Sequence, residues 1–285
     1  MINITAMTTI CADIFDGSGE ILLGGEALNF AMSISSSYPD INISLMGAVG
    51  NDEIGKKAVE CIRNSSIDMS CVHVIDGGKT ASNKIYHDAG GDRYFKEDSW
   101  DGGVYQDFTL SDIDRAKLRE TDIVFINYSC PNFAEILALK SEYGYKLAVD
   151  FDVAANYDEI GNIVGSIEFN FFSGNDDMLP IIEEWSKLHN GIFNATLAER
   201  GSVSYHKGEE YRVNAVPVET IVDTTGCGDN YHAAFLASYV TNCNNLDTFK
   251  SAIISDNADI AQTILSAMNS GSLQASRTLT HIGGF

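Results

Sequence analysis

The sequence predicts an α/β fold, in which helices cover both faces of a mostly parallel sheet and a small β-sheet is inserted as a lid. Near-continuous apolar runs alternate with helical stretches over most of the 285 residues, which is the pattern of buried parallel strands joined by helices. Residues 73–106 interrupt this alternation with many glycine, aspartate and aromatic residues. The length suits one large hydrophobic core, so we expect residues 1–285 to form a single domain.

The strands and helices are predicted from the period and length of the apolar runs. Seven runs read as buried strands: residues 4–10, 43–49, 123–128, 146–151, 168–172, 192–197 and 202–206. Six stretches read as helices: residues 27–37, 54–64, 133–143, 179–190, 230–240 and 251–265. Because helices separate most of these strands, we expect the strands to pair in parallel.

The predicted lid lies at about residues 73–107. An alternating run at 81–87 stands between the turn signals Asp76-Gly-Gly78 and Ala89-Gly-Gly-Asp92, which favour short antiparallel strands. Such a sheet beside a ligand cleft can close over it and exclude water. Ile85, Tyr94 and Phe95 would expose apolar surface on the lid, so a homodimer formed through the lid is a further expectation, with a monomer as the alternative.

The chain is strongly acidic. It has 18 Lys and Arg against 40 Asp and Glu, a formal charge of -22, and such a surface repels nucleic acid and anionic membranes. No apolar run is long enough to cross a bilayer, and no basic segment precedes the first apolar run. The six cysteines contain no Cys-x-x-Cys pair and no metal-ligand spacing to a histidine, which favours free thiols in the cytoplasm.

The most informative segment is Asp223-Thr-Thr-Gly-Cys-Gly-Asp229, between an extended apolar run at 216–222 and the predicted helix at 230–240. The backbone N–H groups of Gly226, Cys227 and Gly228 would point outward at the helix N-terminus, where unpaired donors and the helix dipole favour an anion. Asp229 follows them and is placed to take a proton from an attacking hydroxyl group. The arrangement suits phosphoryl transfer.

A plainer interpretation is a strand-to-helix loop whose aspartate only caps the helix, because short glycine motifs occur by chance. Two other phosphate-binding motifs are absent from the sequence. There is no Gly-x4-Gly-Lys-Ser/Thr loop, and the first strand–helix unit lacks the spaced glycines of a dinucleotide site.

Five segments, in order along the chain, resemble the motifs of the ribokinase-like carbohydrate kinases, also called the phosphofructokinase-B family. They are Gly24-Gly25-Glu26-Ala27-Leu28-Asn29, Met46-Gly-Ala-Val-Gly50-Asn-Asp52-Glu-Ile-Gly55, Gly91-Asp92-Arg93-Tyr94-Phe95, Thr196-Leu197-Ala198-Glu199-Arg200-Gly201 and Asp223–Asp229. The resemblance covers essentially the whole chain. It implies a three-layer α/β/α fold with a β lid, and an ATP-dependent kinase that uses Mg2+ and phosphorylates a sugar hydroxyl.

The resemblance also implies roles for individual residues. Asp229 would be the general base, and the N–H groups of Gly226, Cys227 and Gly228 would form the anion hole. The sugar-binding residues would be Asp13, Gly25, Glu26, Asn29 and, from the lid, Arg93. The nucleotide would lie against Thr196, Ala198, Gly201 and Asn257. Family members often bind a monovalent cation beside the anion hole, so Asp223 and the Thr225 carbonyl are candidates for K+.

Three positions depart from the family pattern. Cys227 replaces an alanine; the anion hole uses backbone N–H groups and should survive, but a thiol at a helix N-terminus is expected to ionise and react with alkylating reagents. Ala198 replaces a glycine of the nucleotide loop. The family's Asn-x-x-Glu, which organises Mg2+ through water, is represented only by Asn175-Asp176-Asp177-Met178, so Asn175 and Asp177 are the candidates for that role.

The substrate is not fixed by these motifs. Glu26 puts a carboxylate inside the sugar loop, where a neutral sugar needs no charge but the amine of a fructosamine-type adduct would benefit from one. The lid run and the C-terminal residues are similar to those of fructoselysine-kinase-like members. A plain fructose or ribose substrate, a nucleoside kinase of the same superfamily, and a non-catalytic sugar- or nucleotide-binding sensor are the alternatives.

Overall fold

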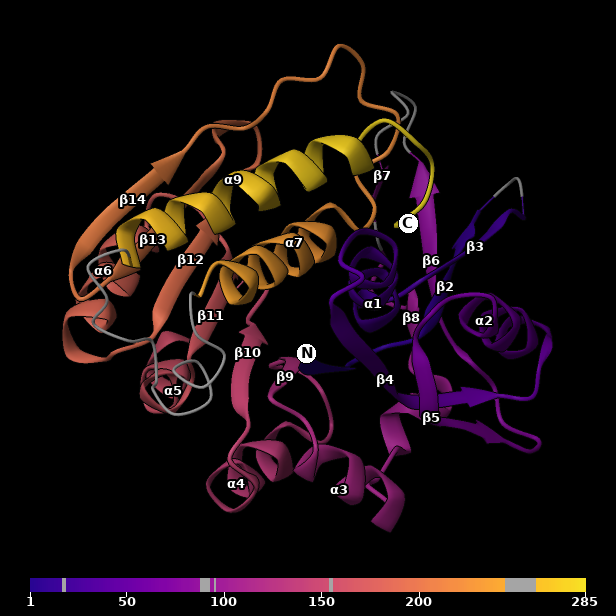
Figure 1. Ribbon diagram of the computed structural model, residues 1–285. Helices are drawn as coiled ribbons and strands as arrows, with labels where there is room; N and C mark the ends of the chain where they lie inside the picture. Colours follow the sequence, from indigo (N-terminus) through magenta and orange to yellow (C-terminus); the bar gives the residue numbers. More distant parts are fainter. Residues whose placement is uncertain (17–18, 88–92, 95, 154–155, 244–259) are drawn as a thin grey trace.

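The computed structural model describes residues 1–16, 19–87, 93–94, 96–153, 156–243 and 260–285. Within these residues the main feature is a nine-stranded sheet with the order β14-β13-β12-β11-β10-β9-β1-β4-β5 (Figure 1). Its strands are β1 (Ile2–Met7), β4 (Ile41–Gly50), β5 (Asp68–Ile75), β9 (Ile123–Asn127), β10 (Lys146–Asp150), β11 (Phe169–Ser173), β12 (Ile192–Thr196), β13 (Ser202–His206) and β14 (Glu209–Val213). Pairing is parallel from β5 to β12, and antiparallel at β13 and β14. The mostly parallel sheet is confirmed.

Helices connect most of these strands, and those over residues 112–119 and 157–161 were not predicted from the sequence. The helices are α1 (Glu26–Ser37), α2 (Glu53–Arg63), α3 (Asp112–Arg119), α4 (Phe133–Tyr143), α5 (Tyr157–Gly161), α6 (Leu179–Leu188), α7 (Cys227–Asn242) and α9 (Ile260–Thr278), with short 3-10 turns η1 (Gly103–Asp107), η2 (Val164–Ser166) and η3 (Ala198–Arg200). Residues 251–259 of the last predicted helix lie outside the described residues. None of the described helices is long and apolar enough to cross a membrane.

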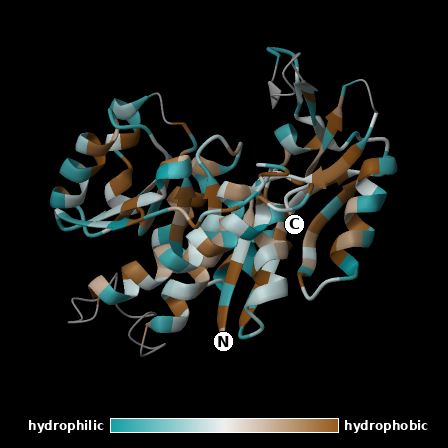
Figure 2. Ribbon diagram, turned by 90° about the horizontal axis from the view of Figure 1, so that it is seen from above, coloured by the Kyte–Doolittle hydropathy of each residue, from teal (hydrophilic) through white to brown (hydrophobic). Residues whose placement is uncertain are grey.

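The two faces of the sheet carry separate hydrophobic cores, which confirms the three layers. One core joins the sheet to α1, α2, α7 and α9, and the other joins it to α3, α4, α5 and α6. Figure 2 shows the hydrophobic strands inside and hydrophilic residues along the outer faces of the helices. On the first face Phe30 of α1 stacks on Phe125 of β9 with ring centroids 4.0 Å apart.

A close contact between α7 and α9 depends on Gly271. A Cβ at this position of α9 would lie 2.8 Å from the ring of Tyr231 in α7. The Tyr231 hydroxyl is fixed in turn by a 2.8 Å hydrogen bond with Ser202 of β13. Glycine therefore lets α9 press α7 onto the sheet, and this contact helps to set the position of the first turn of α7.

The small second sheet contains β3, β2, β6 and β7, with β8 paired to β6. Their bounds are β2 (Cys11–Phe15), β3 (Ile21–Gly24), β6 (Ala81–His87), β7 (Arg93–Tyr94) and β8 (Trp100–Asp101). The predicted lid stretch supplies only β6, β7 and β8, whereas its residues 73–75 belong to β5 of the main sheet. β2 and β3 were not predicted from the sequence, because residues 11–15 lie just beyond the apolar run at 4–10 that indicates the first strand.

The exposed side chains of this lid differ from the prediction. Ile85, expected to show apolar surface, is 1% exposed, whereas Trp100 on β8 is 49% exposed. The lid is tied to the main sheet near the start of β6. There the Asp52 carboxylate accepts hydrogen bonds from Thr80 N at 2.8 Å, Thr80 Oγ1 at 2.6 Å and Gly55 N at 2.8 Å. Phe95 lies outside the described residues.

The apolar run at residues 216–222 was expected to be an extended strand leading into the helix at 230–240, and this prediction is wrong. This segment belongs to neither sheet, and Val216, Ile221 and Val222 are exposed. Pro217 removes one backbone donor that a central strand would need. The N–H of Val222 donates instead to the carbonyl of Leu279 at 2.8 Å, so the loop before α7 is held by the C-terminal residues.

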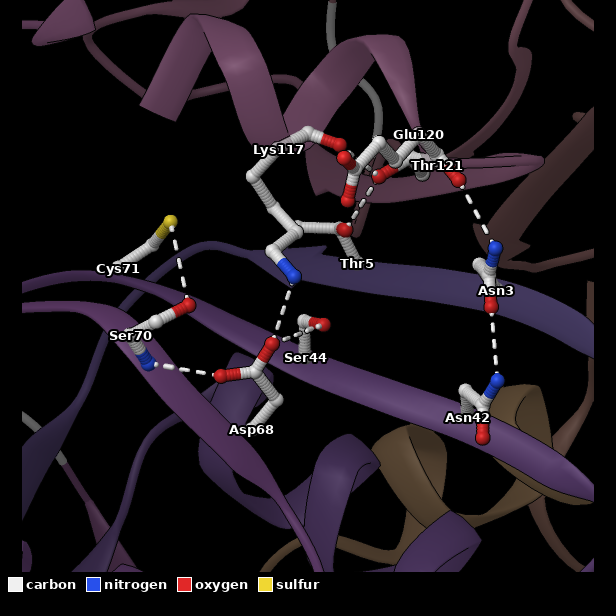
Figure 3. A network of polar contacts seen from close by, with 10 residues as sticks. All are labelled: Asn3, Thr5, Asn42, Ser44, Asp68, Ser70, Cys71, Lys117, Glu120 and Thr121. Atoms are coloured by element: carbon white, nitrogen blue, oxygen red, sulfur yellow. Dashed lines mark hydrogen bonds and ion pairs between the residues drawn. The ribbon is translucent and has the colours of Figure 1, made fainter. Parts of the chain in front are cut away.

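A polar network closes the amino-terminal side of β1, β4 and β5 (Figure 3). Lys117 Nζ donates to Asp68 Oδ2 at 2.6 Å, and Asn42 Nδ2 donates to Asn3 Oδ1 at 2.8 Å. The residues line a groove of about 290 Å³. Because these polar side chains are paired with one another, we interpret the network as structural rather than as a ligand site.

Candidate active site

The candidate site lies at the carboxyl ends of the parallel strands. β1 pairs with β4 on one side and with β9 on the other, so chain connections leave in opposite directions at β1. Ligands of open α/β sheets bind in the crevice at such a switch point. Asn127 ends β9 and Asp150 ends β10, so both lie beside this crevice.

Asp229 is held at this place from a second helix. It lies in the first turn of α7, half-buried, and its Oδ2 accepts a 2.7 Å hydrogen bond from Nδ2 of Asn29 in α1. Asn29 is only 3% exposed. The predicted base and the predicted sugar-loop asparagine are therefore in direct contact, although 200 residues separate them.

Gly25 explains how α1 comes so close. It precedes α1 with a φ of 96°, and a Cβ there would lie 2.5 Å from the carbonyl oxygen of Thr9. Any other residue would push the start of α1 away from the connection between β1 and β2. The glycine of the predicted sugar loop thus positions Glu26 and Asn29.

Three carboxylates meet at the site. One oxygen from each of Glu26, Asp150 and Asp229 lies within 4.8 Å of the others. Burial raises the pKa of Asp229 to about 6, with Asp150 acting in the same direction and the Asn29 hydrogen bond against it. Burial, Asp150 and Asp229 together raise the pKa of Glu26 well above its ordinary value. Three negative charges at this spacing repel one another, so the site favours a proton or another cation.

His232 lies behind this cluster. It is 1% exposed on α7, its ring stacks on Phe171 at 4.4 Å, and its Nδ1 is 3.3 Å from Asp150 Oδ2. The other oxygen of Asp150 accepts a 2.7 Å hydrogen bond from Asp152 N. Burial acts to raise the pKa of Asp150, but His232 and the Asp152 N–H outweigh it and hold the pKa below its ordinary value.

The glycine turn of the expected anion hole begins α7. Gly226 precedes the helix with a φ of 70°, and the Cys227 N–H donates to the Thr224 carbonyl at 3.3 Å. A Cβ on Gly228 would meet no described atom within 4 Å, so the backbone is open to an approaching ligand there. The open helix end is compatible with an anion site, but one of the three expected donors already has a partner.

The reactive thiol expected at Cys227 is not supported. Burial, together with the nearby Asp229 charge, raises the pKa of Cys227 to about 11. Its Sγ also contacts the Ala275 carbonyl at 3.5 Å. The helix N-terminus is outweighed because the thiol faces α9 and a carboxylate rather than open solvent.

Asp223, a candidate for the monovalent cation, has a clear structural contact. It is 3% exposed, and its two oxygens accept hydrogen bonds from Thr225 N at 2.7 Å and Gly283 N at 2.9 Å. Nearby, Asn230 Nδ2 donates to the Gly284 carbonyl at 2.6 Å. Hydrogen bonds thus connect the C-terminal residues to the loop of the expected anion hole.

The remaining sugar candidates belong to the lid. Asp13 lies on β2, where it pairs with Leu22 on β3 and with Asn83 on β6. The Oδ1 of Asn83 is buried with no hydrogen-bond partner among the described residues, so Asn83 joins Asp13 as a candidate. Arg93 lies on β7 opposite His87.

The nucleotide candidates lie at the end of β12. Thr196 is the last residue of β12. Ala198 begins η3 with a φ of 51°, and Gly201 follows the end of η3 with a φ of 87°. A Cβ on Gly201 would lie 2.0 Å from the Val213 carbonyl oxygen, so glycine is required there. Asn257 lies outside the described residues.

The expected Mg2+ segment is adjacent to this loop. Asp176 pairs with Arg200 of η3 at 2.7 Å. The Asn175 side-chain oxygen accepts from the N–H groups of Asp177 and Met178, at 3.1 and 3.2 Å, and so closes a turn. Asp177 is exposed. Its carboxylate is therefore a better candidate for holding an ion through water than the side-chain oxygen of Asn175, which already accepts two hydrogen bonds.

Asp150, Asn127 and His232 were missed from the sequence. Asp150 and Asn127 are polar residues at the carboxyl ends of predicted parallel strands, which is a signal that points to the ligand crevice. His232 had no such signal. Its role appears only when α7 lies across β10 and β11.

The comparisons with known proteins show the family of the chain. The model of the pfkB family carbohydrate kinases matches residues 16–140 and 153–282. This chain belongs to that family. It is therefore a carbohydrate kinase.

Individual relatives are similar to it over nearly their full length. A fructoselysine 6-kinase from Escherichia coli K12 is 28% identical over 260 residues, 89% of this chain and 94% of the relative. The solved nucleoside kinase of Methanocaldococcus jannaschii aligns with a TM-score of 0.75 and 20% identity, over 100% of this chain and 93% of its own. An E. coli ribokinase homologue solved with ATP and Mg2+ aligns at a TM-score of 0.78 and 15% identity, over 100% and 94%.

Proposed function

We propose that this carbohydrate kinase moves the γ-phosphate of ATP to a hydroxyl of a sugar derivative, with Asp229 as the base. The observation that carries the proposal is the Asp229 carboxylate, held by Asn29 at 2.7 Å beside the open N-terminus of α7. A base with a pKa near 6 is ionised at neutral pH and still basic enough to accept a proton as the hydroxyl attacks. We also propose that residues 1–285 act as one domain.

In the proposed mechanism the sugar lies between the lid and the three carboxylates, and ATP lies along the loop at Thr196–Gly201. Asp229 takes the hydroxyl proton as the oxygen attacks the γ-phosphorus in line. The N–H groups at the start of α7 face the charge that develops on the phosphoryl oxygens. Mg2+, held through water near Asp177, would supply positive charge to the phosphates. Closure of the lid would exclude water as a competing acceptor.

The substrate we propose is a sugar that carries an amine, of the fructosamine type. Glu26 Oε1 is buried with no hydrogen-bond partner among the described residues, and two further carboxylates lie within 4.8 Å. No lysine or arginine in the described part of the chain forms an ion pair with any of the three. The name of the 28% identical relative, fructoselysine 6-kinase, supports the same class.

The proposal is tested by coupled ADP release over a panel of fructoselysine, fructose, ribose and nucleosides. We expect turnover on the sugar amine, and kcat lower by about two to four powers of ten in Asp229→Asn, the scale of a positioned base. Asp40→Asn, an exposed carboxylate in the turn before β4, is the matched control for the loss of one charge. Turnover on nucleosides alone would identify the protein as a nucleoside kinase. Tight sugar binding without turnover would identify it as a non-catalytic sensor.

Smaller parts of the proposal follow from single features. K+ would bind near Asp223 and the Thr225 carbonyl, on the far side of the anion-hole loop. All six cysteines are free, which supports a cytoplasmic location. A homodimer through the lid stays a proposal, with the half-exposed Trp100 rather than the buried Ile85 as its contact.

A further inference from the structure

Before substrate binds, the carboxylate cluster needs a positive partner. Glu26, Asp150 and Asp229 place one oxygen each within 4.8 Å, and the basic side chain beside them in the described residues is His232, 3.3 Å from Asp150. Three ionised carboxylates would not be balanced by one histidine. A proton shared between two of the acids lowers the charge without any other ligand.

We propose that Glu26 and Asp150 share one proton, which leaves when the ammonium group of a sugar amine enters, and that His232 is the positioning residue that keeps Asp150 in place for this exchange. The inference rests on the proposed function and adds the device that recognises the substrate's charge. In the exchange, the proton on the carboxyl pair passes to the buffer, and the substrate ammonium takes its place. The total charge of the site is unchanged.

The geometry separates the roles of the two acids. Asp150 has a contact at each oxygen: Asp152 N donates a hydrogen bond to Oδ1 at 2.7 Å, and His232 Nδ1 lies at ion-pair distance from Oδ2, at 3.3 Å. Glu26 has one oxygen with no partner among the described residues. Glu26 is therefore the group that can turn toward a ligand, and Asp150 is the fixed group behind it. Asp229 keeps its hydrogen bond to Asn29 and is left for the hydroxyl proton.

Other titratable groups lie around the site of Glu26 and Asp150, and any proton count must include them. They are Cys11 and Asp13 on β2, Tyr105 on η1, Asp152 after β10, and Asp229 and His232 on α7. Burial raises the pKa of the Cys11 thiol and of the Tyr105 hydroxyl, so both stay protonated through the neutral range. The exchange is therefore assigned to the carboxyl pair.

Titration calorimetry at pH 7 in two buffers of different ionisation enthalpy counts the protons. Fructoselysine binding to the wild-type enzyme should release about one proton per site, and fructose binding should release close to none. Glu26→Gln should release none with either sugar. Equal release with both sugars, or no release with fructoselysine, would overturn the inference. Release of the same size on addition of Mg2+ alone would also overturn it, because the cluster would then be a metal site.

The role of His232 is tested with two variants. His232→Leu removes the ion-pair contact with Asp150, and we expect KM for fructoselysine to rise about tenfold, within the range for removing the partner of a buried polar group, with little change in kcat. His232→Asn keeps an N–H group near the position of Nδ1 and should restore KM. Equal effects on fructoselysine and fructose would indicate a merely structural role and overturn the assignment.

Two controls separate this inference from the proposed function. If His232→Leu does not fold, Asp150→Asn, which keeps the side-chain volume, should abolish the difference in proton release between the two sugars. Turnover of fructoselysine without proton release would refute the exchange while leaving the kinase proposal intact. Failure to bind or phosphorylate any sugar amine would refute both.

Discussion

At the residue scale, we expect the environment of Asp229, the proposed base, to set the pH range in which the enzyme works. The base must be ionised, and burial raises its pKa to about 6. We therefore expect kcat/KM to be constant above about pH 7 and to fall about tenfold per unit below pH 6. A pH–rate profile with the neutral sugar fructose as well as with fructoselysine checks this. A fall centred near pH 4, the range of an exposed aspartate, would contradict it.

The raised pKa of Asp229 also predicts that the ionised aspartate lowers the free energy of unfolding of the protein. Because the pKa of Asp229 is higher in the folded protein than in the unfolded chain, its ionised form destabilises the fold above pH 6. Asp229→Asn should therefore have a higher Tm than wild type at pH 8, with a difference that shrinks as the pH falls toward 5. Differential scanning calorimetry measures it. The prediction fails if Asp229→Asn melts below wild type at pH 8.

The site was predicted from the sequence as far as its motifs extend. Asp229, Asn29, Gly25 and Glu26 stand in two motifs, and the structure brings the motifs together. Asp150 and His232 belong to no motif. Their importance depends on α7 crossing the ends of β10 and β11, which is a relation between distant segments that local patterns do not contain.

At the scale of elements, the nucleotide loop contains a strained residue. Ala198 adopts a φ of 51°, a conformation that costs about 1–2 kcal/mol in a residue with a Cβ. Ala198→Gly should raise the free energy of unfolding by about 1 kcal/mol, since glycine also gains entropy in the unfolded chain. Urea denaturation measures this difference.

Gly201 provides the matched control in the same turn. Its φ is 87°, and a Cβ would lie 2.0 Å from the Val213 carbonyl oxygen. Gly201→Ala should therefore destabilise the protein, whereas Ala198→Gly stabilises it. Changes of the same sign in the two variants would count against this account of the loop.

The elements that sequence reasoning found and missed differ in burial. The seven predicted strands are all in the main sheet, because their apolar runs are buried on both faces. β5 and β14 lie at its edges, where polar residues interrupt the apolar pattern. Residues 216–222 were predicted as a strand but are not one. Their apolar side chains remain exposed, and the segment is held by a hydrogen bond to Leu279 instead of by a sheet.

At the scale of the whole molecule, the net charge of -22 opposes binding of a nucleotide. Salt screens this repulsion. We expect KM for MgATP to fall about two- to threefold between 10 and 150 mM ionic strength at constant Mg2+. Tetramethylammonium chloride as the salt keeps this effect apart from any K+ binding near Asp223. A rise in KM would mean that contacts with basic residues dominate.

The two tryptophans offer an optical probe of the lid. Trp100 is half-exposed on β8 of the small sheet, whereas Trp185 lies on α6 at the other end of the molecule, 6.2 Å from the ring of Phe172. With Trp185→Phe the tryptophan emission of the protein comes from Trp100 alone. Sugar-dependent closure can then be followed in stopped flow without a dye, and compared with the rate of turnover.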